Sequence, residues 1–141
     1  MPATEVLLDS NVLIYALSDI PSERSKRDRA RALIATTDFG LSYQILMETW
    51  VVATRKMMPP VPLDRVVAFL RDILEFPCVP GTEGLVQQAM DLAARFGIHP
   101  YDAAILAAAH ELGATTVYTE DLNHNQDYDG VRVINPFLGK D

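Results

Sequence analysis

Short apolar runs alternate along the chain with longer segments of helical periodicity. The apolar runs, which predict strands, lie at residues 5–8, 38–41, 76–80, 114–119 and 131–134. Apolar residues three or four positions apart predict helices at about 22–35, 42–58, 63–73, 82–96 and 100–112. Residues 11–17 form only a short segment after the first strand. Strands that alternate with helices indicate an α/β fold whose parallel sheet is covered on both faces.

Polar and small residues mark the ends of several predicted helices. Ser22 and Ser42 are predicted N-caps, because a hydroxyl oxygen there accepts a hydrogen bond from a free backbone amide. Thr82 begins the next helix, and Gly97 follows its last apolar residue at the usual C-terminal position for glycine. Gly113 ends the alanine-rich helix that begins near residue 100.

Composition narrows the class of protein. The chain has 141 residues, of which 49% are hydrophobic, so we expect one domain over residues 1–141 with a proper core. The single cysteine, Cys78, excludes an internal disulfide framework, and we expect it in the core. No apolar run approaches the ~18 residues of a membrane span. The first residues also lack the basic region of a signal peptide, so we expect a cytoplasmic protein with no membrane association.

The charge balance limits how the chain could handle nucleic acid. Twelve Lys and Arg against 19 Asp and Glu give a net charge of −7. A protein that grips nucleic acid by neutralising many phosphates should be basic. Metal ions or a local basic patch would therefore have to balance a polyanionic substrate here.

Four carboxylates occupy positions that favour chemistry. Asp9 and Asp121 follow directly after predicted strands. Glu48 interrupts an apolar helical stripe, and Asp102 lies in the first turn of a helix that is otherwise apolar. Each also has an ordinary explanation. Asp9 suits a turn, Glu48 could pair with Arg55 or lie at an exposed edge, and Asp102 could interact with the helix dipole.

Together the four acids predict a metal site, provided that the two strands are neighbours in the sheet. Carboxylates that converge without Lys or Arg repel one another unless divalent cations bind between them. Ligation by oxygen alone suits Mg²⁺ or Mn²⁺ rather than zinc. The chemistry that such a site supports is phosphodiester hydrolysis.

The order and the flanks of these acids resemble the PIN domain (PilT N-terminus). The segments that carry the resemblance are VLLDSNVLIY, SYQILMETW, HPYDAAILAAA, VYTEDLNH and the final GVRVINPF. More narrowly, the chain is similar to VapC toxins of bacterial type II toxin–antitoxin systems. The resemblance covers essentially the whole chain. It implies a three-layer α/β/α fold whose central parallel sheet has the strand order 3-2-1-4-5.

The resemblance also implies a function and a set of site residues. It implies a homodimeric endoribonuclease that depends on Mg²⁺ or Mn²⁺, cleaves RNA and is inhibited by a VapB-like antitoxin. The implied catalytic residues and metal ligands are Asp9, Glu48, Asp102 and Asp121. Asn11 would orient Asp9, and Thr119 would contribute a supporting hydroxyl.

The chain departs from the family pattern after the fourth acid. Asn123, His124 and Asn125 stand where Asp-Phe often follows, which makes Asp127 an extra candidate. We also expect the antitoxin to lay an amphipathic segment in a hydrophobic groove and to reach the acids with an arginine.

Several alternatives remain open from the residues alone. A dehalogenase-type phosphatase needs Asp-x-Asp, but the second position here is Asn11. The basic stretch at residues 24–31 is either a solvated helix face or a receiver of the RNA backbone through Arg24, Lys26 and Arg27. Tyr101 could stack on a base or pack. A non-catalytic PIN-like binding module and a DNA-directed nuclease are the alternative functions, and metal-dependent cleavage of RNA separates them.

Overall fold

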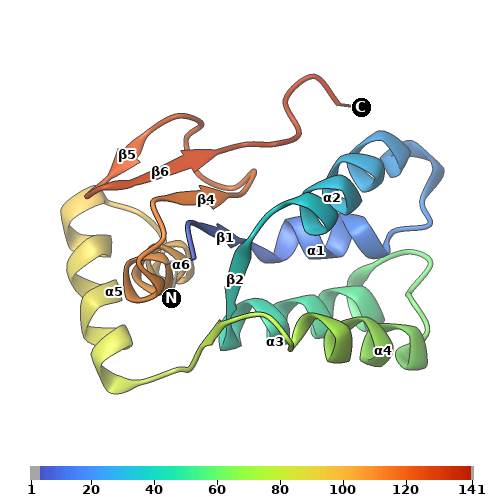
Figure 1. Ribbon diagram of the computed structural model, residues 1–141, viewed down its shortest axis with the longest axis horizontal. Helices are drawn as coiled ribbons and strands as arrows, with labels where there is room; N and C mark the ends of the chain where they lie inside the picture. Colours follow the sequence, from blue (N-terminus) through green and yellow to red (C-terminus); the bar gives the residue numbers. More distant parts are fainter. Residues whose placement is uncertain (1–3, 141) are drawn as a thin grey trace.

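In the computed structural model, a mostly parallel sheet carries helices on both faces (Figure 1). The structure describes residues 4–140, so the predicted domain limits at residues 1 and 141 lie outside the described residues. The strands are β1 (Val6–Leu8), β2 (Phe39–Ser42), β3 (Cys78–Val79), β4 (Thr116–Tyr118), β5 (Asp127–Tyr128) and β6 (Val131–Ile134).

Within residues 4–140, six α-helices and two short helical turns connect the strands. The helices are α1 (Ser10–Leu17), α2 (Arg24–Thr36), α3 (Tyr43–Val51), α4 (Leu63–Ile73), α5 (Glu83–Phe96) and α6 (Pro100–Leu112). A 3₁₀ turn, η1 (Pro21–Glu23), precedes α2, and a π-helical turn, η2 (Val52–Lys56), follows α3. No helix within residues 4–140 is long and apolar enough to cross a membrane.

The strand order confirms the expected topology and adds one strand. The order in the sheet is β3-β2-β1-β4-β6-β5, and every pair is parallel except β5 with β6. The predicted order 3-2-1-4-5 therefore holds for the parallel strands, of which β6 is the fifth. The prediction of a purely parallel sheet missed β5, which pairs with β6 through a two-residue turn. Asp129 and Gly130 both have positive φ there (58° and 92°), as the Asp-Gly turn of a tight hairpin requires.

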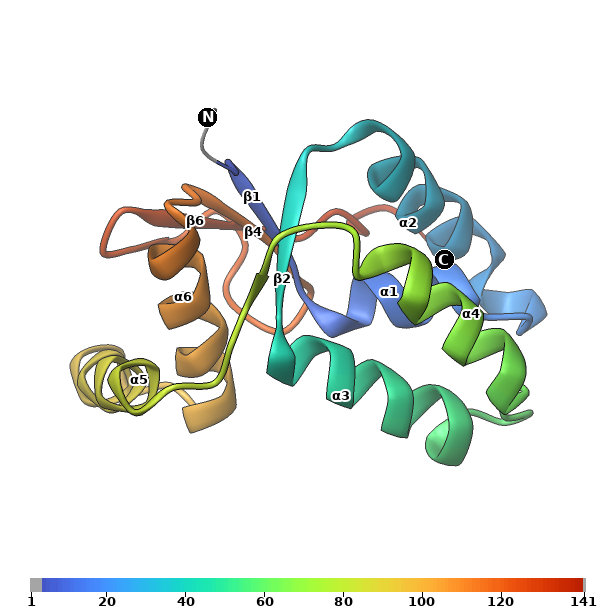
Figure 2. The same ribbon diagram turned by 60° about the horizontal axis from the view of Figure 1, so that its bottom comes forward.

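The direction of the chain through the sheet decides which helices cover which face. The chain moves outward from β1 to β2 and β3 through α1–α4, then returns through α5 and α6 to β4 on the other side of β1. Right-handed crossovers in opposite directions place α1–α4 on one face and α5 and α6 on the other, as Figures 1 and 2 show. The carboxyl ends of β1 and β4 therefore border the point where the strand order reverses, which is where α/β sheets bind ligands.

The segment after β1 is a helix rather than the short connection that the sequence predicted. Helix α1 begins at Ser10, whose backbone N–H donates to the Asp9 side chain. Most of its residues are buried, including polar Ser10 and Asn11. Helix α1 packs between α2 and α3, so it is buried on most sides. Its sequence therefore lacks the alternation of an apolar and a polar face by which most helices are recognised.

The predicted helix ends are confirmed with one exception. Ser42 accepts from the Ile45 amide and Thr82 from the Leu85 amide. Gly97 adopts a left-handed conformation that ends its helix. Ser22 is not an N-cap, because it lies within η1 and α2 begins only at Arg24.

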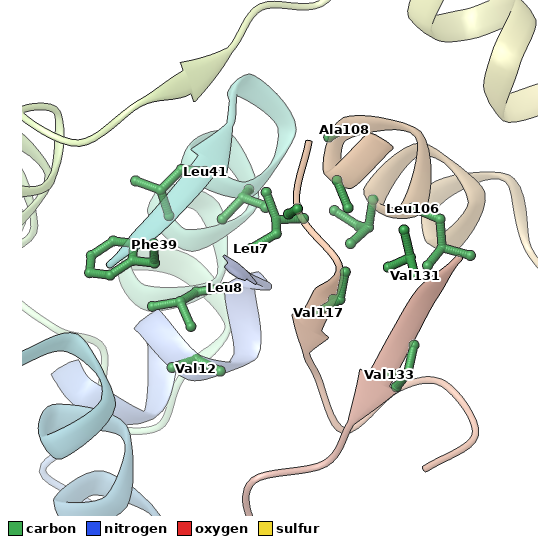
Figure 3. Close-up of a cluster of buried hydrophobic side chains, with 14 of the residues drawn as sticks. Leu7, Leu8, Val12, Phe39, Leu41, Leu106, Ala108, Val117, Val131 and Val133 are labelled. Carbon is green, nitrogen blue, oxygen red and sulfur yellow. The ribbon is translucent and has the colours of Figure 1, made fainter. Parts of the chain in front are cut away.

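The core lies between the sheet and the helices on its two faces. Figure 3 shows Leu7 and Leu8 of β1 near Val117 of β4, with Leu106 and Ala108 of α6 on one side. Four alanines of α6 are fully buried, namely Ala103, Ala107, Ala108 and Ala109, and their small side chains let that helix lie close to the strands. Cys78 does not belong to this core: it is exposed on the sheet's edge strand β3, contrary to the prediction.

Gly84 in the first turn of helix α5 and Gly97 directly after its last turn should respond in opposite ways to substitution by alanine. Gly84→Ala places a methyl group on an exposed helical position and should stabilise the protein by up to ~1 kcal/mol, because alanine loses less backbone entropy on folding. Gly97→Ala should destabilise it by ~1–2 kcal/mol, because Gly97 has φ 64° and an L-residue is strained there.

Urea unfolding of the two variants and the wild type measures both effects. No atom lies within 4 Å of a Cβ placed on Gly97, so a clash would not explain its loss of stability. Equal effects of the two substitutions would contradict the assigned helix end.

Candidate functional site

Asp9 lies at the carboxyl end of β1, beside the carboxyl end of β4. Its backbone N–H donates to the Tyr118 carbonyl (3.1 Å), which fixes the start of α1 against β4. Its side chain is 3% exposed. One carboxylate oxygen accepts from the Ser10 N–H (2.7 Å) and the other from the Thr119 hydroxyl (2.8 Å). Both oxygens of a nearly inaccessible acid are therefore held in fixed directions.

The environment of Asp9 favours its protonated form. Burial raises the pKa of Asp9 from 3.8 to about 7, and nearby Asp121 and Glu48 add smaller contributions in the same direction. Hydrogen bonds from Thr119 and Ser10 act in the opposite sense, because they stabilise the carboxylate. A bound cation would restore the charged form at neutral pH.

Thr119 and Asn11 connect Asp9 with Asp121. The buried Thr119 hydroxyl donates to Asp9 and accepts from the Asn11 side-chain amide (3.0 Å) and from the Asp121 N–H (3.1 Å). The same Asn11 amide also donates to the Asp121 carboxylate (3.3 Å). Asn11 thus acts on Asp9 through Thr119 rather than by the direct hydrogen bond that the sequence suggested.

Glu48 reaches the site from α3 and is bound by neutral donors. The Ser10 hydroxyl donates to one of its oxygens (2.9 Å) and the Gln44 side-chain amide to the other (2.7 Å). Gln44 also donates to the Tyr101 carbonyl (3.3 Å), which ties α3 to the start of α6. The alternative pairing of Glu48 with Arg55 does not occur among the ion pairs of residues 4–140.

Asp102 lies half-buried in the first turn of α6. It is not the N-cap of that helix, because His99 caps it with a ring nitrogen that accepts from the Tyr101 N–H. Burial raises the pKa of Asp102, Asp121 and Glu48 raise it further, and His99 lowers it. Asp9 and Asp102 both respond to the charges of Asp121 and Glu48, so the four acids share one electrostatic environment.

The site residues fit a cation that is held partly by water. Within residues 4–140, no three His, Cys, Asp or Glu side chains lie at the spacing of a preformed metal cage. Mg²⁺ seldom uses such a cage, since it keeps several waters and takes one or two carboxylates. The donors are all oxygen, and no Lys or Arg forms an ion pair with the four acids in the described chain. The buried Asn11 side-chain oxygen there also lacks a donor.

A second polar network borders the site, and sequence reasoning missed it. The Tyr15 hydroxyl donates to Glu120 (2.8 Å), while the Lys26 ammonium lies 3.2 Å from that hydroxyl and 3.7 Å from the Glu120 carboxylate. Burial raises the pKa of Tyr15, and the hydrogen bond to Glu120 raises it further. Glu120 is therefore held in place by two neighbours, Tyr15 and Lys26. No local pattern could reveal this network, because its members are far apart in the sequence.

The basic residues of the stretch at 24–31 make different contacts in the structure. Lys26 lies beside Glu120, whereas Arg27 pairs with Asp28 (3.3 Å) and Arg24 is exposed at the start of α2. The side chains of Arg29 and Arg31 bind backbone carbonyls and so serve the fold. The predicted contact of Arg24, Lys26 and Arg27 with RNA stays a prediction.

Two other predicted residues have clear positions. Asp127, the extra acid, accepts from the Gly130 N–H and lies near Arg132, so it belongs to the β5–β6 hairpin. Tyr101 does not belong to the core, since 66% of its surface is exposed and its ring lies beside that of His99 (5.3 Å between centroids).

An apolar groove of about 600 Å³ lies between α3, α5 and α6. Glu48 and Gln44 stand at its edge, so the groove adjoins the acids. Large apolar side chains that line it are exposed to solvent: Tyr43, Met47, Val86, Met90 and Tyr101. An exposed apolar surface of this kind is typical of a protein interface.

Solved structures with the same fold belong to toxin–antitoxin systems. The chain is similar to the Mycobacterium tuberculosis VapC20 toxin, described as cleaving the sarcin–ricin loop (19% identity, TM-score 0.67, 83% of this chain and 90% of that one). It is similar to a chain of a Klebsiella pneumoniae toxin–antitoxin complex (20% identity, TM-score 0.65, 94% of this chain and 98% of that one). It is also similar to a chain of DNA-bound VapBC from Salmonella typhimurium (21% identity, TM-score 0.63, 94% of this chain and 98% of that one).

The family membership of the chain follows from its match to a family model. A comparison with curated proteins found no significant match. The PIN domain model matches residues 6–127, which include all four acids as well as Asn11 and Thr119. The strand order and the position of the acids at the switch point agree with that match. The protein therefore belongs to the PIN domain family.

Proposed function

We propose that this protein is an Mg²⁺- or Mn²⁺-dependent endoribonuclease and the toxic component of a toxin–antitoxin pair. The observation that carries the proposal is the shared environment of Asp9, Glu48, Asp102 and Asp121 at the switch point of the sheet. Family membership supports nuclease chemistry, and the similar structures include a toxin described as cleaving a ribosomal RNA loop. The acidic composition fits a substrate whose charge is balanced locally by metal ions.

The four acids would hold the metal, which supplies an activated water and a Lewis acid for the phosphate. Thr119 fixes the Asp9 carboxylate by donating to it, and Asn11 holds Thr119 and Asp121 in register. Ser10 and Gln44 orient Glu48 in the same way from the opposite side. These neutral donors position negative oxygens without cancelling their charge, so the acids remain available to a cation.

The proposed partners are a cognate antitoxin and a second copy of the chain. Similar structures are complexes of a toxin with its antitoxin, which supports a protein inhibitor for this chain too. An arginine of that inhibitor would neutralise the acids, because its guanidinium pairs bidentately with carboxylates. For the homodimer we propose the apolar groove between α3, α5 and α6 as the interface.

RNA cleavage should require both a divalent metal and Asp102. With Mn²⁺ or Mg²⁺ the wild type should cleave single-stranded RNA, and EDTA should stop it. Asp102→Asn should reduce cleavage by more than about a hundredfold, since losing even an outer partner of a metal ligand costs ~10–100-fold. Asp127→Asn is the matched control and should keep full activity, because Asp127 serves the β5–β6 hairpin.

Gel-based cleavage assays on matched RNA and DNA oligonucleotides distinguish the alternatives. Cleavage of DNA alone would support a DNA-directed nuclease, and cleavage of neither with any divalent metal would support a binding module.

The stability of the metal-free protein should fall as pH rises through neutrality. The folded protein holds the Asp9 proton more tightly than the unfolded chain, because the folded pKa is about 7 and the ordinary value is 3.8. This stabilisation is complete below the ordinary pKa and is lost as pH rises through about 7. The slope from this group should reach up to about 1.4 kcal/mol per pH unit.

Urea unfolding in EDTA between pH 5 and 8 measures this slope. Asp9→Asn should remove most of it, and excess Mn²⁺ should abolish it, since the metal binds the carboxylate form and leaves no proton to release. A wild type and an Asp9→Asn variant with identical profiles in EDTA would show that Asp9 titrates normally.

Dimerisation should depend on the apolar groove. Met90→Glu places a charge on a groove residue of which 60% is exposed, so it should yield a folded monomer. Leu138→Glu is the control, because Leu138 has a similar exposure (58%) outside the groove, and this variant should stay dimeric. Light scattering at micromolar concentration gives the molar masses. A monomeric wild type, or a dimeric Met90→Glu variant, would contradict this interface.

A further inference from the structure

A second, smaller cavity extends along α1 away from the acids. We call it the α1 slot; its volume is about 400 Å³, which is within the usual range for small-ligand pockets. Residues Asn11, Ile14 and Tyr15 of α1 line it, and it continues to Ile20 beyond the end of that helix. Asn11 also belongs to the hydrogen-bond chain that joins Asp9 and Asp121. The slot therefore begins beside the hydrogen-bond chain that joins Asp9 and Asp121.

The two sides of the α1 slot differ in charge. Helix α1 packs between α2 on one side and α3 with η2 on the other (Figure 1). On the α2 side stand the carboxylates Glu120 and Glu23, and Glu120 is anchored by Tyr15 and Lys26. On the η2 side stands Lys56, which forms no ion pair with any carboxylate of residues 4–140.

Apolar side chains supply the rest of the α1 slot. Ile14, Val52 and Met57 line it, and Met58, 80% exposed, stands at the outside. Such a lining suits a flat, largely apolar group with polar edges. A cationic side chain would meet Lys56 and an anionic one would meet the two glutamates. The slot therefore favours an uncharged group that donates hydrogen bonds on one edge and accepts them on another.

Guanine has this distribution of donors and acceptors. Its N1–H and N2–H₂ groups lie side by side and match a carboxylate, while O6 and N7 accept from a lysine. Adenine and cytosine offer a single amino group, and uracil offers one ring N–H. Single-stranded RNA is commonly recognised through bases that leave the stack and bind in such pockets.

We propose that the α1 slot binds a guanine base of the RNA next to the phosphodiester that is cleaved. Glu120 reads the N1–H and N2–H₂ edge, and Lys56 reads O6 and N7. The proposal rests on the proposed ribonuclease function, because it makes these residues determinants of the cleavage site. Tyr15 and Lys26 act as positioning residues that hold the Glu120 carboxylate at the slot.

The NMR signals of the methionine methyl groups can detect binding in the α1 slot independently of RNA cleavage. Met57 and Met58 line the α1 slot, whereas Met47 and Met90 line the apolar groove on the other side of α3 and serve as internal controls. In the full-length protein in EDTA, with ¹³C-methyl-labelled methionine, GMP should shift the signals of Met57 and Met58 only. AMP, CMP and UMP should bind about tenfold or more weakly.

Two variants test the assigned contacts. Lys56→Gln should weaken GMP binding about tenfold, and Lys140→Gln, which removes an equal charge from an exposed position near the C-terminus, should leave it unchanged. In cleavage assays of the wild type, inosine in place of the guanosine beside the cleaved bond should lower kcat/KM, because inosine lacks the 2-amino group. Glu120→Gln should abolish this discrimination between guanosine and inosine.

The outcomes separate this proposal from the ribonuclease function. Cleavage of RNA with no preference for guanosine, together with unshifted Met57 and Met58 signals, would overturn the slot and leave the function standing. Shifts of Met57 and Met58 by GMP in a protein that cleaves no RNA would support the slot and overturn the function. Shifts caused by an antitoxin peptide but by none of the four nucleotides would overturn the proposal and assign the slot to a protein partner.

Discussion

The burial of one carboxylate at the end of β1 is the constraint on which the rest of the site depends. Asp9 is almost inaccessible, and an acid in that position is costly unless hydrogen bonds or a cation compensate it. The backbone of Ser10 and the hydroxyl of Thr119 supply the hydrogen bonds, and Asn11 holds Thr119 in turn. These contacts start α1 and fasten it to β4. The same interactions therefore build the local fold and fix the geometry of the acids.

The two faces of the sheet bring different parts to that point. From one face, α3 presents Glu48, which Ser10 and Gln44 orient. From the other face, α6 presents Asp102 in its first turn, and its buried alanines allow the helix to lie against several strands at once. Gln44 links the two by donating to the Tyr101 carbonyl. The site thus lies where both helical layers meet the carboxyl edge of the sheet.

The distribution of cations explains how a chain of net charge −7 could act on a polyanion. Positive charge is kept off the four acids and placed beside them: Lys26 with Glu120 and Tyr15, and Lys56 across the α1 slot. Neutral donors orient the acids, so their charge is left for a divalent ion. In the proposed function, this arrangement would separate two tasks: the acids at the switch point would hold metal ions, and the residues beside them would contact the substrate.

The sequence alone determined the α/β class, most helix ends and the family, because these depend on local patterns such as strand runs, the Ser42 and Thr82 caps and the acids with their flanks. It did not reveal α1, whose buried polar residues hide the helical period, or β5, which is only two residues long. It also misplaced Cys78, since the exposure of a side chain depends on which distant segment covers it. Only the tertiary structure decided that Asn11 reaches Asp9 through Thr119, that Tyr15 and Lys26 anchor Glu120, and that Lys56 lines the same cavity as two glutamates. Those contacts join residues far apart in the chain, and no local periodicity encodes them.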